Sequence, residues 1–463
     1  MNIRIMIASF AFLVAIVLLG FLLLPSNVSS SKAESLSSVS ASSTWSPLPV
    51  RDPPIRSQEP VGMLPQIHQT NLEIVTDNAA TGDGGNSWGG HQTRIVHTED
   101  GVFTAYTVEG GGYFAREWRL AWRQNDGTWS VIAQGLAGRE PVNLLASPDR
   151  TLHIIGWPNG VGTMWSGKPE SSTLALDTTV IPNVATGYWP YGSAGIDEAG
   201  NLCVLSSTGG EEPGGTFDWA CYLPSQTRWI TQTSELDYRY CYTYMFPDPD
   251  RQLSLVSTRD VRWEALGYEK PPGESDYVFN AFRYWRTSSV ISEAIEELSY
   301  AEEVPTDQYP APYLNAQADA YLDTNDRMHI IYWRYGASTG GNWQLRHRVV
   351  SPDGNLLHDV RMPDELGGWS RIFQDRHGRF YILGSSGRLY PAGQDGVDLG
   401  TPTMLDLEGY EVEYSGFGVS VPRTGTPLSD IVDVVFPSDN GTKWIYFRID
   451  LSSQLIYLPL VLR

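Results

Sequence analysis

The chain has 463 residues, and its 53 Asp and Glu against 32 Lys and Arg give a formal net charge of −21 at pH 7. An acidic chain without a basic run repels nucleic-acid phosphates, so the composition argues against a nucleic-acid partner. Its 3 cysteines are too few for a disulfide scaffold, and its length alone does not set the number of domains.

The N-terminus carries an apolar, uncharged run from Ile5 to Leu24. At about 1.5 Å per helical residue, this run matches the hydrocarbon thickness of a bilayer. It is either a signal peptide cleaved near Ser31-Lys32-Ala33 or a retained anchor. We therefore assign residues 1–30 to a signal or anchor segment. We expect a secreted or cell-surface protein that meets a membrane only through this segment.

Residues 31–70 are rich in Ser and then Pro, which predicts a linker without a core. Residues 71–463 combine many aromatic residues and glycines with little helical periodicity, which indicates an all-β domain. The one stretch with helical periodicity is Ser292 to Ser299. We expect this domain to be monomeric.

A repeat of about fifty residues organises the all-β part. Each unit has an Asp in a short turn, then an apolar or alternating strand, then a second hairpin such as the one at Asn125-Asp126-Gly127. The turn aspartates are Asp100, Asp149, Asp197, Asp250, Asp323, Asp375 and Asp430. We interpret them as turn formers that accept backbone N–H bonds, not as catalytic groups.

Four strands per unit predict a β-propeller of about seven four-stranded blades, because one such sheet buries too little by itself. Six or eight blades remain alternatives, since the spacing between Asp250 and Asp323 is longer than the others. We attribute that length to an insertion that carries the short helix. Leu455 to Leu462 would form the outer strand of the last blade.

Cys203 and Cys221 fall on adjacent antiparallel strands of one predicted blade. We expect them, with Cys241, to be buried small apolar side chains. A single bridge between Cys203 and Cys221 is the alternative.

Two features resemble the sialidase-like, BNR-repeat class of propellers. The stretches 125–129 and 351–355 keep the Asp and Gly of its Asp box, and Thr93-Arg94-Ile95-Val96 is similar to its Arg-Ile-Pro segment, with Val96 in place of Pro. The resemblance implies a glycan ligand whose carboxylate is bound by Arg94, and it matches no other catalytic position of that family.

In a four-stranded blade, the loop into the innermost strand and the loop between the second and third strands share one face, here called the top face. Aromatic rings stack on sugars and Arg pairs with carboxylates, so these loops supply the candidate residues. The catalytic candidates are Arg94, Glu211, Glu264 and Tyr268. The substrate-binding candidates are His91, Gln92, Arg116, Trp157, Arg262, Arg334 and Trp369.

These residues favour an extracytoplasmic carbohydrate-active propeller that acts on or binds complex or acidic glycans. Glu211 or Glu264 would serve a glycoside hydrolase, whereas His91 and Tyr268 would serve a polysaccharide lyase with Arg94 on the uronate. The rival hypothesis is a noncatalytic surface module that binds a glycan, a peptide or an envelope component. Asp77 and Asp83 suggest no more than a structural calcium, and we expect no cofactor.

Overall fold

The computed structural model describes residues 67–112, 114–169, 174–210, 212–250, 252–291, 294–303, 314–413 and 415–452. The apolar run Ile5 to Leu24 and most of the predicted linker lie outside these ranges. Within them, no helix is long and apolar enough to cross a membrane.

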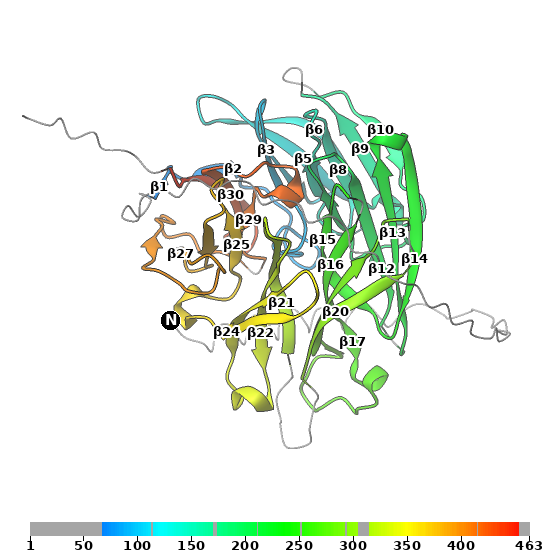
Figure 1. Cartoon of the computed structure of the whole chain (residues 1–463). Coiled ribbons are helices and arrows are strands. Elements are labelled where there is room, and N and C mark those ends of the chain that lie inside the picture. Colours follow the sequence, from blue (N-terminus) through cyan, green and yellow to red (C-terminus); the bar gives the residue numbers. More distant parts are fainter. Residues whose placement is uncertain are drawn as a thin grey trace, which may run out of the picture. The chain divides into compact units, whose positions relative to one another are not determined.

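The described chain forms a seven-bladed β-propeller of antiparallel sheets, which confirms the predicted fold (Figure 1). The first strands of neighbouring blades contact one another and surround the axis, as β3 (Ile95–Thr98) does with β7 (Asn143–Ala146). The seventh blade meets the first, because β30 (Ile431–Ser438) contacts β3 and closes the ring.

The first six blades each contain four strands, which run in chain order from the axis outward. Blade 1 comprises β3, β4 (Gly101–Val108), β5 (Arg116–Arg123) and β6 (Trp129–Gly138). Blade 2 comprises β7, β8 (Leu152–Gly156), β9 (Thr163–Gly167) and β10 (Asp177–Val180). Blade 3 comprises β11 (Ser193–Ile196), β12 (Leu202–Gly209), β13 (Gly215–Leu223) and β14 (Arg228–Leu236). Blade 4 comprises β15 (Tyr240–Pro247), β16 (Leu253–Arg259), β19 (Ala281–Thr287) and β20 (Ile295–Glu302). Blade 5 comprises β21 (Leu314–Leu322), β22 (Met328–Tyr335), β23 (Gln344–Val350) and β24 (Leu356–Arg361). Blade 6 comprises β25 (Arg371–Gln374), β26 (Phe380–Leu383), β27 (Arg388–Ala392) and β28 (Thr403–Met404).

Short 3₁₀ helices occupy several of the connecting loops. They are η1 (Pro158–Gly160), η2 (Pro224–Gln226), η3 (Trp263–Leu266), η4 (Ala337–Thr339), η5 (Asp364–Leu366) and η6 (Pro422–Thr424).

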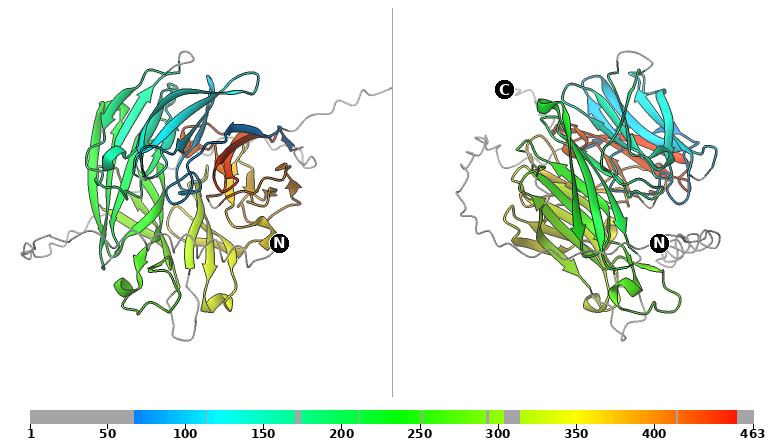
Figure 2. Two further views of the ribbon diagram at one scale, coloured as in Figure 1. Left: turned by 180° about the vertical axis from the view of Figure 1, so that it is seen from behind. Right: turned by 90° about the vertical axis from the view of Figure 1, so that its right-hand side faces the viewer.

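The outer strand of the last blade comes from the start of the described chain. Blade 7 contains β29 (Gly418–Val419), β30 and β31 (Lys443–Asp450), and the outer edge of β31 pairs with β1 (His68–Gln69) and β2 (Glu73–Thr76). The blue N-terminal strands therefore lie against the red C-terminal ones in Figure 1 and in the left view of Figure 2. Strands β1 and β2 occupy the position that was predicted for Leu455 to Leu462, and those residues lie outside the described ranges.

The core is divided into layers between neighbouring blades. One layer joins Val256 and Tyr284 of blade 4 to Ile330 of blade 5, and another joins Trp444 of blade 7 to Val102 of blade 1. Each sheet thus packs against a neighbour on both faces, and its inner strands are buried over most of their length, as in β8 and β12. Burial of these layers is what makes a ring of small sheets stable.

The predicted role of the turn aspartates is confirmed in four blades. Carboxylate oxygens of Asp149, Asp197, Asp323 and Asp375 accept backbone N–H bonds from residues two or four positions later. In blade 4 the prediction named the wrong residue, because Asp248 accepts the bond, from the N–H of Asp250 at 2.7 Å.

The predicted helix at Ser292 to Ser299 is wrong. Its described part, from Ala294, leads into the outer strand β20, whose bonds to β19 override the local periodicity. The long fourth unit does carry an insertion, but it lies between β16 and β19. It contains β17 (Val261–Arg262), η3 and β18 (Tyr277–Val278), and we call it the blade-4 insert.

The loop between β29 and β30 enters the axis of the ring, and we call residues 420–430 the plug. Its helix η6 contacts the innermost strands β7, β11 and β15 of three other blades. Its Thr426 hydroxyl accepts the N–H of His97 in β3 at 2.9 Å. Gly425, at φ 88°, lies so close to Ala146 that a Cβ would be 1.8 Å from the Ala146 carbonyl oxygen. Only glycine fits this approach.

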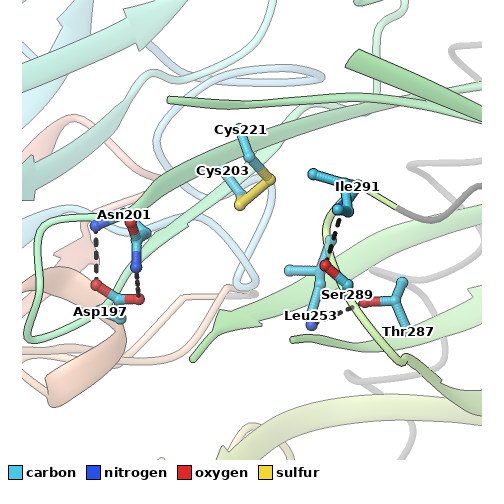
Figure 3. The surroundings of a disulfide bond; sticks show 8 residues. All are labelled: Asp197, Asn201, Cys203, Cys221, Leu253, Thr287, Ser289 and Ile291. Atoms are coloured by element: carbon cyan, nitrogen blue, oxygen red, sulfur yellow. Dashed lines mark hydrogen bonds between the residues drawn. A yellow bond between two sulfur atoms is a disulfide. The ribbon is translucent and has the colours of Figure 1, made fainter. Parts of the chain in front are cut away.

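A disulfide joins Cys203 of β12 to Cys221 of β13, which lie directly opposite each other in blade 3 (Figure 3). The alternative of a single bridge is therefore correct. All three cysteines are buried as expected, and Cys241 is the free one. Opposed positions on neighbouring antiparallel strands bring two Cβ atoms close enough for a bridge.

Candidate functional site

The loop before β3 places the predicted residues His91, Gln92 and Arg94 together, all buried beside the axis. The Arg94 guanidinium donates to the backbone carbonyls of Asn86, Trp88 and Gly89 and, at 3.3 Å, to Oε1 of Gln92. Burial, together with the charge of Arg371, lowers the pKa of Arg94 to about 9. Arg94 thus organises the loop and is still charged at neutral pH.

His91 is a neutral packing residue. Its Nε2 lies 3.2 Å from the Gly192 carbonyl, so Nε2 carries the proton and donates. Burial lowers the pKa of His91 to about 3, and the charges of Arg423, Arg94 and Arg371 act in the same direction. Its ring packs edge-on against Tyr242.

Arg116 and Trp157 support top-face loops from below. Arg116 donates to the carbonyls of Thr81 and Asp83, each at 2.8 Å. The buried Trp157 ring packs so tightly under Gly192 that a Cβ there would lie 2.3 Å from it.

The remaining candidates are spread over other blades. Arg334 donates from Nε to Glu303 at 2.9 Å, and Trp369 lies half-buried in the loop before β25. Arg262, Glu264 and Tyr268 lie on the blade-4 insert, where Glu264 and Tyr268 are exposed. Glu211 lies outside the described residues.

The catalytic candidates do not form one constellation in the described part of the chain. No hydrogen bond or ion pair there joins Glu264 or Tyr268 to Arg94. Carboxylates near the top face pair instead with local arginines: Glu303 with Arg334, and Asp260 with Arg239 at 3.0 Å. The described residues also contain no group of three or more His, Cys, Asp or Glu suited to a metal ion.

Two axial arginines were missed by the sequence analysis. Arg371 lies at the start of β25 in blade 6, and Arg94 lies directly before β3 in blade 1. In both places the sequence has a hydroxyl residue, Arg and Ile, as Ser370-Arg371-Ile372 and Thr93-Arg94-Ile95. That repeated pattern was a usable signal. Arg423 comes from the plug, whose entry into the axis has no local signature.

An exposed aromatic cluster was also missed. Phe114 of the β4–β5 loop and Tyr188 and Trp189 of the β10–β11 loop are 38%, 47% and 40% exposed. The Phe114 ring centroid lies 4.7 Å from that of Tyr188 and 6.4 Å from that of Trp189. We call these three side chains the aromatic platform. The run Gly187-Tyr188-Trp189-Pro190, directly before an innermost strand, is the signal that could have indicated it.

Two buried ionisable side chains, Arg139 and Glu140, hold the platform loop in place. Cζ of Arg139 lies 3.0 Å from the centroid of the Trp189 ring. Nη2 of the same arginine forms an ion pair with Oδ1 of Asp83 at 2.5 Å. Glu140 accepts the N–H groups of Tyr191 and Gly192, each at 3.2 Å, which follow Trp189 and Pro190 in the chain. These contacts hold Trp189 and the backbone after it in place before any ligand arrives, which lowers the entropic cost of binding to that ring.

Glu140 predicts a pH-dependent stability. Burial raises its pKa from 4.5 to about 7. The folded chain then binds this proton more tightly than the unfolded chain does. The contribution of Glu140 to the free energy of unfolding is therefore largest below pH 4.5 and declines as the pH rises to about 7. We expect the unfolding free energy of the natural chain, relative to Glu140→Gln, to fall by about 3 kcal/mol over this range in urea titrations.

Glu303→Gln provides a control of opposite sign. Burial acts to raise the pKa of Glu303, but hydrogen bonds from Ser338 and the Arg334 charge lower it overall. The contribution of Glu303 to the free energy of unfolding is therefore lost as the pH falls. Parallel pH profiles for the two variants would contradict this assignment.

No family model matches the sequence, and no curated protein matches it. Among solved structures, the chain is similar to virginiamycin B lyase from Staphylococcus aureus, with 9% identity, a TM-score of 0.39, and coverage of 84% of this chain and 99% of that one. It is also similar to a protein of unknown function from Dyadobacter fermentans, with 8% identity, a TM-score of 0.42, and 83% and 99% coverage. A third is BBS1N in complex with ARL6DN, with 9% identity, a TM-score of 0.43, and 85% and 99% coverage. Similarities this distant assign no function.

Proposed function

We propose that this protein is a noncatalytic, extracytoplasmic binding propeller that recognises a glycan on its top face. The observation that carries the proposal is the aromatic platform, three exposed rings from two loops, of which Trp189 lies over the buried Arg139. Aromatic faces bury the apolar faces of sugar rings, and a ring fixed in advance does this at little entropic cost. The disulfide and the apolar N-terminal run support an oxidising location outside the cytoplasm.

A binding role agrees better with the top-face charges than hydrolysis or elimination does. Acid/base chemistry needs two groups that converge on one substrate with suitable pKa values. Here Glu303 and Asp260 are each engaged by an arginine, and Arg94 donates to backbone carbonyls. The sialidase-like resemblance thus supports a glycan as the ligand, but it does not support hydrolysis of that glycan.

The test is a titration of the full chain with sialylated, neutral and uronate-containing oligosaccharides, followed by tryptophan fluorescence and calorimetry. We expect saturable binding of at least one class and a loss of affinity of about tenfold or more in Trp189→Ala, as for a lost stacking partner. Tyr268→Ala is the matched control, because Tyr268 is similarly exposed but lies on the blade-4 insert.

Equal affinity of the natural chain and Trp189→Ala would exclude the platform. A selective loss in Tyr268→Ala would move the site to the insert. New reducing ends or unsaturated products would show turnover and contradict the noncatalytic assignment.

A further inference from the structure

The axis of the propeller contains a small cavity surrounded by arginines. Its volume is about 20 Å³, and its lining includes Gln92, Arg94, Asp319, Arg371 and Arg423. A water molecule needs about 10–15 Å³ on this measure, so the space admits one or two particles of that size and no sugar ring.

The cavity lining carries more positive than negative charge, in a chain whose net charge is −21. It has three guanidinium groups and one carboxylate, that of Asp319. Among the described residues, no carboxylate lies within ion-pairing distance of Arg94, Arg371 or Arg423. The Asp319 carboxylate accepts the N–H of Ile372 at 2.8 Å instead. Asp319 can balance only one of the three buried positive charges, and an unbalanced buried charge is costly, so this arrangement calls for a compensating anion.

The lining also offers unused donors. Nε of Arg94 and Nε2 of Gln92 are buried and have no hydrogen-bond partner in the described part of the chain. Arg423 donates there to the His91 carbonyl at 2.9 Å and to no other described residue. Arg371, in contrast, donates from all three nitrogens to backbone carbonyls, including that of Gly90 at 3.2 Å. Buried donors without partners usually mark the place of a water molecule or an ion.

We propose that this axial cavity binds a monatomic anion, chloride in most settings, held by Arg94 and Arg423 with help from Gln92. The small volume of the cavity limits the ligand to a monatomic ion, and the positive charge of its lining requires that this ion be an anion. Such an ion would join blade 1 to the plug, because Arg94 precedes β3 and Arg423 lies in η6. The site is separate from the aromatic platform, so the two proposals stand or fall independently.

The test compares thermal unfolding of the full chain in sodium chloride, sodium bromide and sodium gluconate at equal ionic strength. Gluconate is too large for the cavity and therefore controls for screening. We expect the unfolding midpoint to rise by several degrees with either halide, in a saturable way, and not with gluconate. Identical midpoints in halide and gluconate would overturn the proposal.

Arg423→Gln should abolish the halide-specific rise, whereas Arg361→Gln, a change at an exposed arginine, should retain it. A halide effect that persists in Arg423→Gln would also overturn the assignment. Should Arg423→Gln fail to fold, Gln92→Leu removes one donor and is expected to weaken the halide response severalfold. Bromide anomalous scattering from crystals then locates the ion directly, and a peak elsewhere only would refute the site.

Discussion

Deletion of residues 67–76 is expected to abolish cooperative folding of the propeller. These residues supply β1 and β2, which cover the outer edge of β31. The Glu73 carboxylate also binds Arg123 of blade 1, at 2.6 Å from Nη2, and Trp129 Nε1 at 2.9 Å. The deletion therefore exposes a strand edge and removes a link between blades 7 and 1, at a cost of about 5 kcal/mol or more, comparable with the whole stability of many domains.

Circular dichroism during urea unfolding and sedimentation of the native sample measure this loss. Removal of ten residues from the predicted linker, for example 41–50, is the length-matched control and should leave the unfolding midpoint unchanged. A truncated chain that stays monomeric and unfolds at the normal midpoint would show that the ring does not depend on this closure.

The second large effect is expected at the plug. Gly425→Ala should lower the unfolding free energy by about 3 kcal/mol or more, because a Cβ would lie 1.8 Å from the Ala146 carbonyl oxygen in addition to the strain of a positive φ. Gly409→Ala separates the two causes, since Gly409 has φ 83° but no atom within 4 Å of the added Cβ. That control should cost only about 1–2 kcal/mol, the price of the left-handed backbone alone.

Urea unfolding of both variants gives the comparison. Equal losses would mean that the plug moves away from β7 freely, and that its position in the axis is not fixed by packing.

The blade repeat was predictable because its signals are local. An Asp that accepts N–H bonds two and four residues later needs no distant partner, and the turn at Asn125-Asp126-Gly127 behaves likewise, with Thr128 donating to Asp126 at 3.0 Å and Gly127 at φ 85°. Such turns are specified by a few neighbouring residues, so the sequence alone indicates them.

What was missed depends on distant contacts. The outer strand of blade 7 is chosen by pairing between the two ends of the domain, and Ile295–Glu302 became a strand only because β19 offered an edge. The predicted top-face list included Trp157, which is buried, and omitted Trp189, which is exposed, although both lie in comparable loops. Burial of a loop aromatic is decided by neighbouring blades. Arg371 could have been found from its repeat position, but Arg423 could not.

The closure between β1 and β31 also determines the order in which the protein can be completed. His68 of β1 pairs with Asp450 of β31, so the first strand of the described chain waits for the last one. Blades 1 to 6 are each built from a continuous stretch of chain and can form while synthesis continues, as can the bridge between Cys203 and Cys221 at a separation of 18 residues. Until β31 emerges, the ring is open and its edges are unpaired, which makes this interval the one in which the growing chain is most exposed to aggregation and to chaperones.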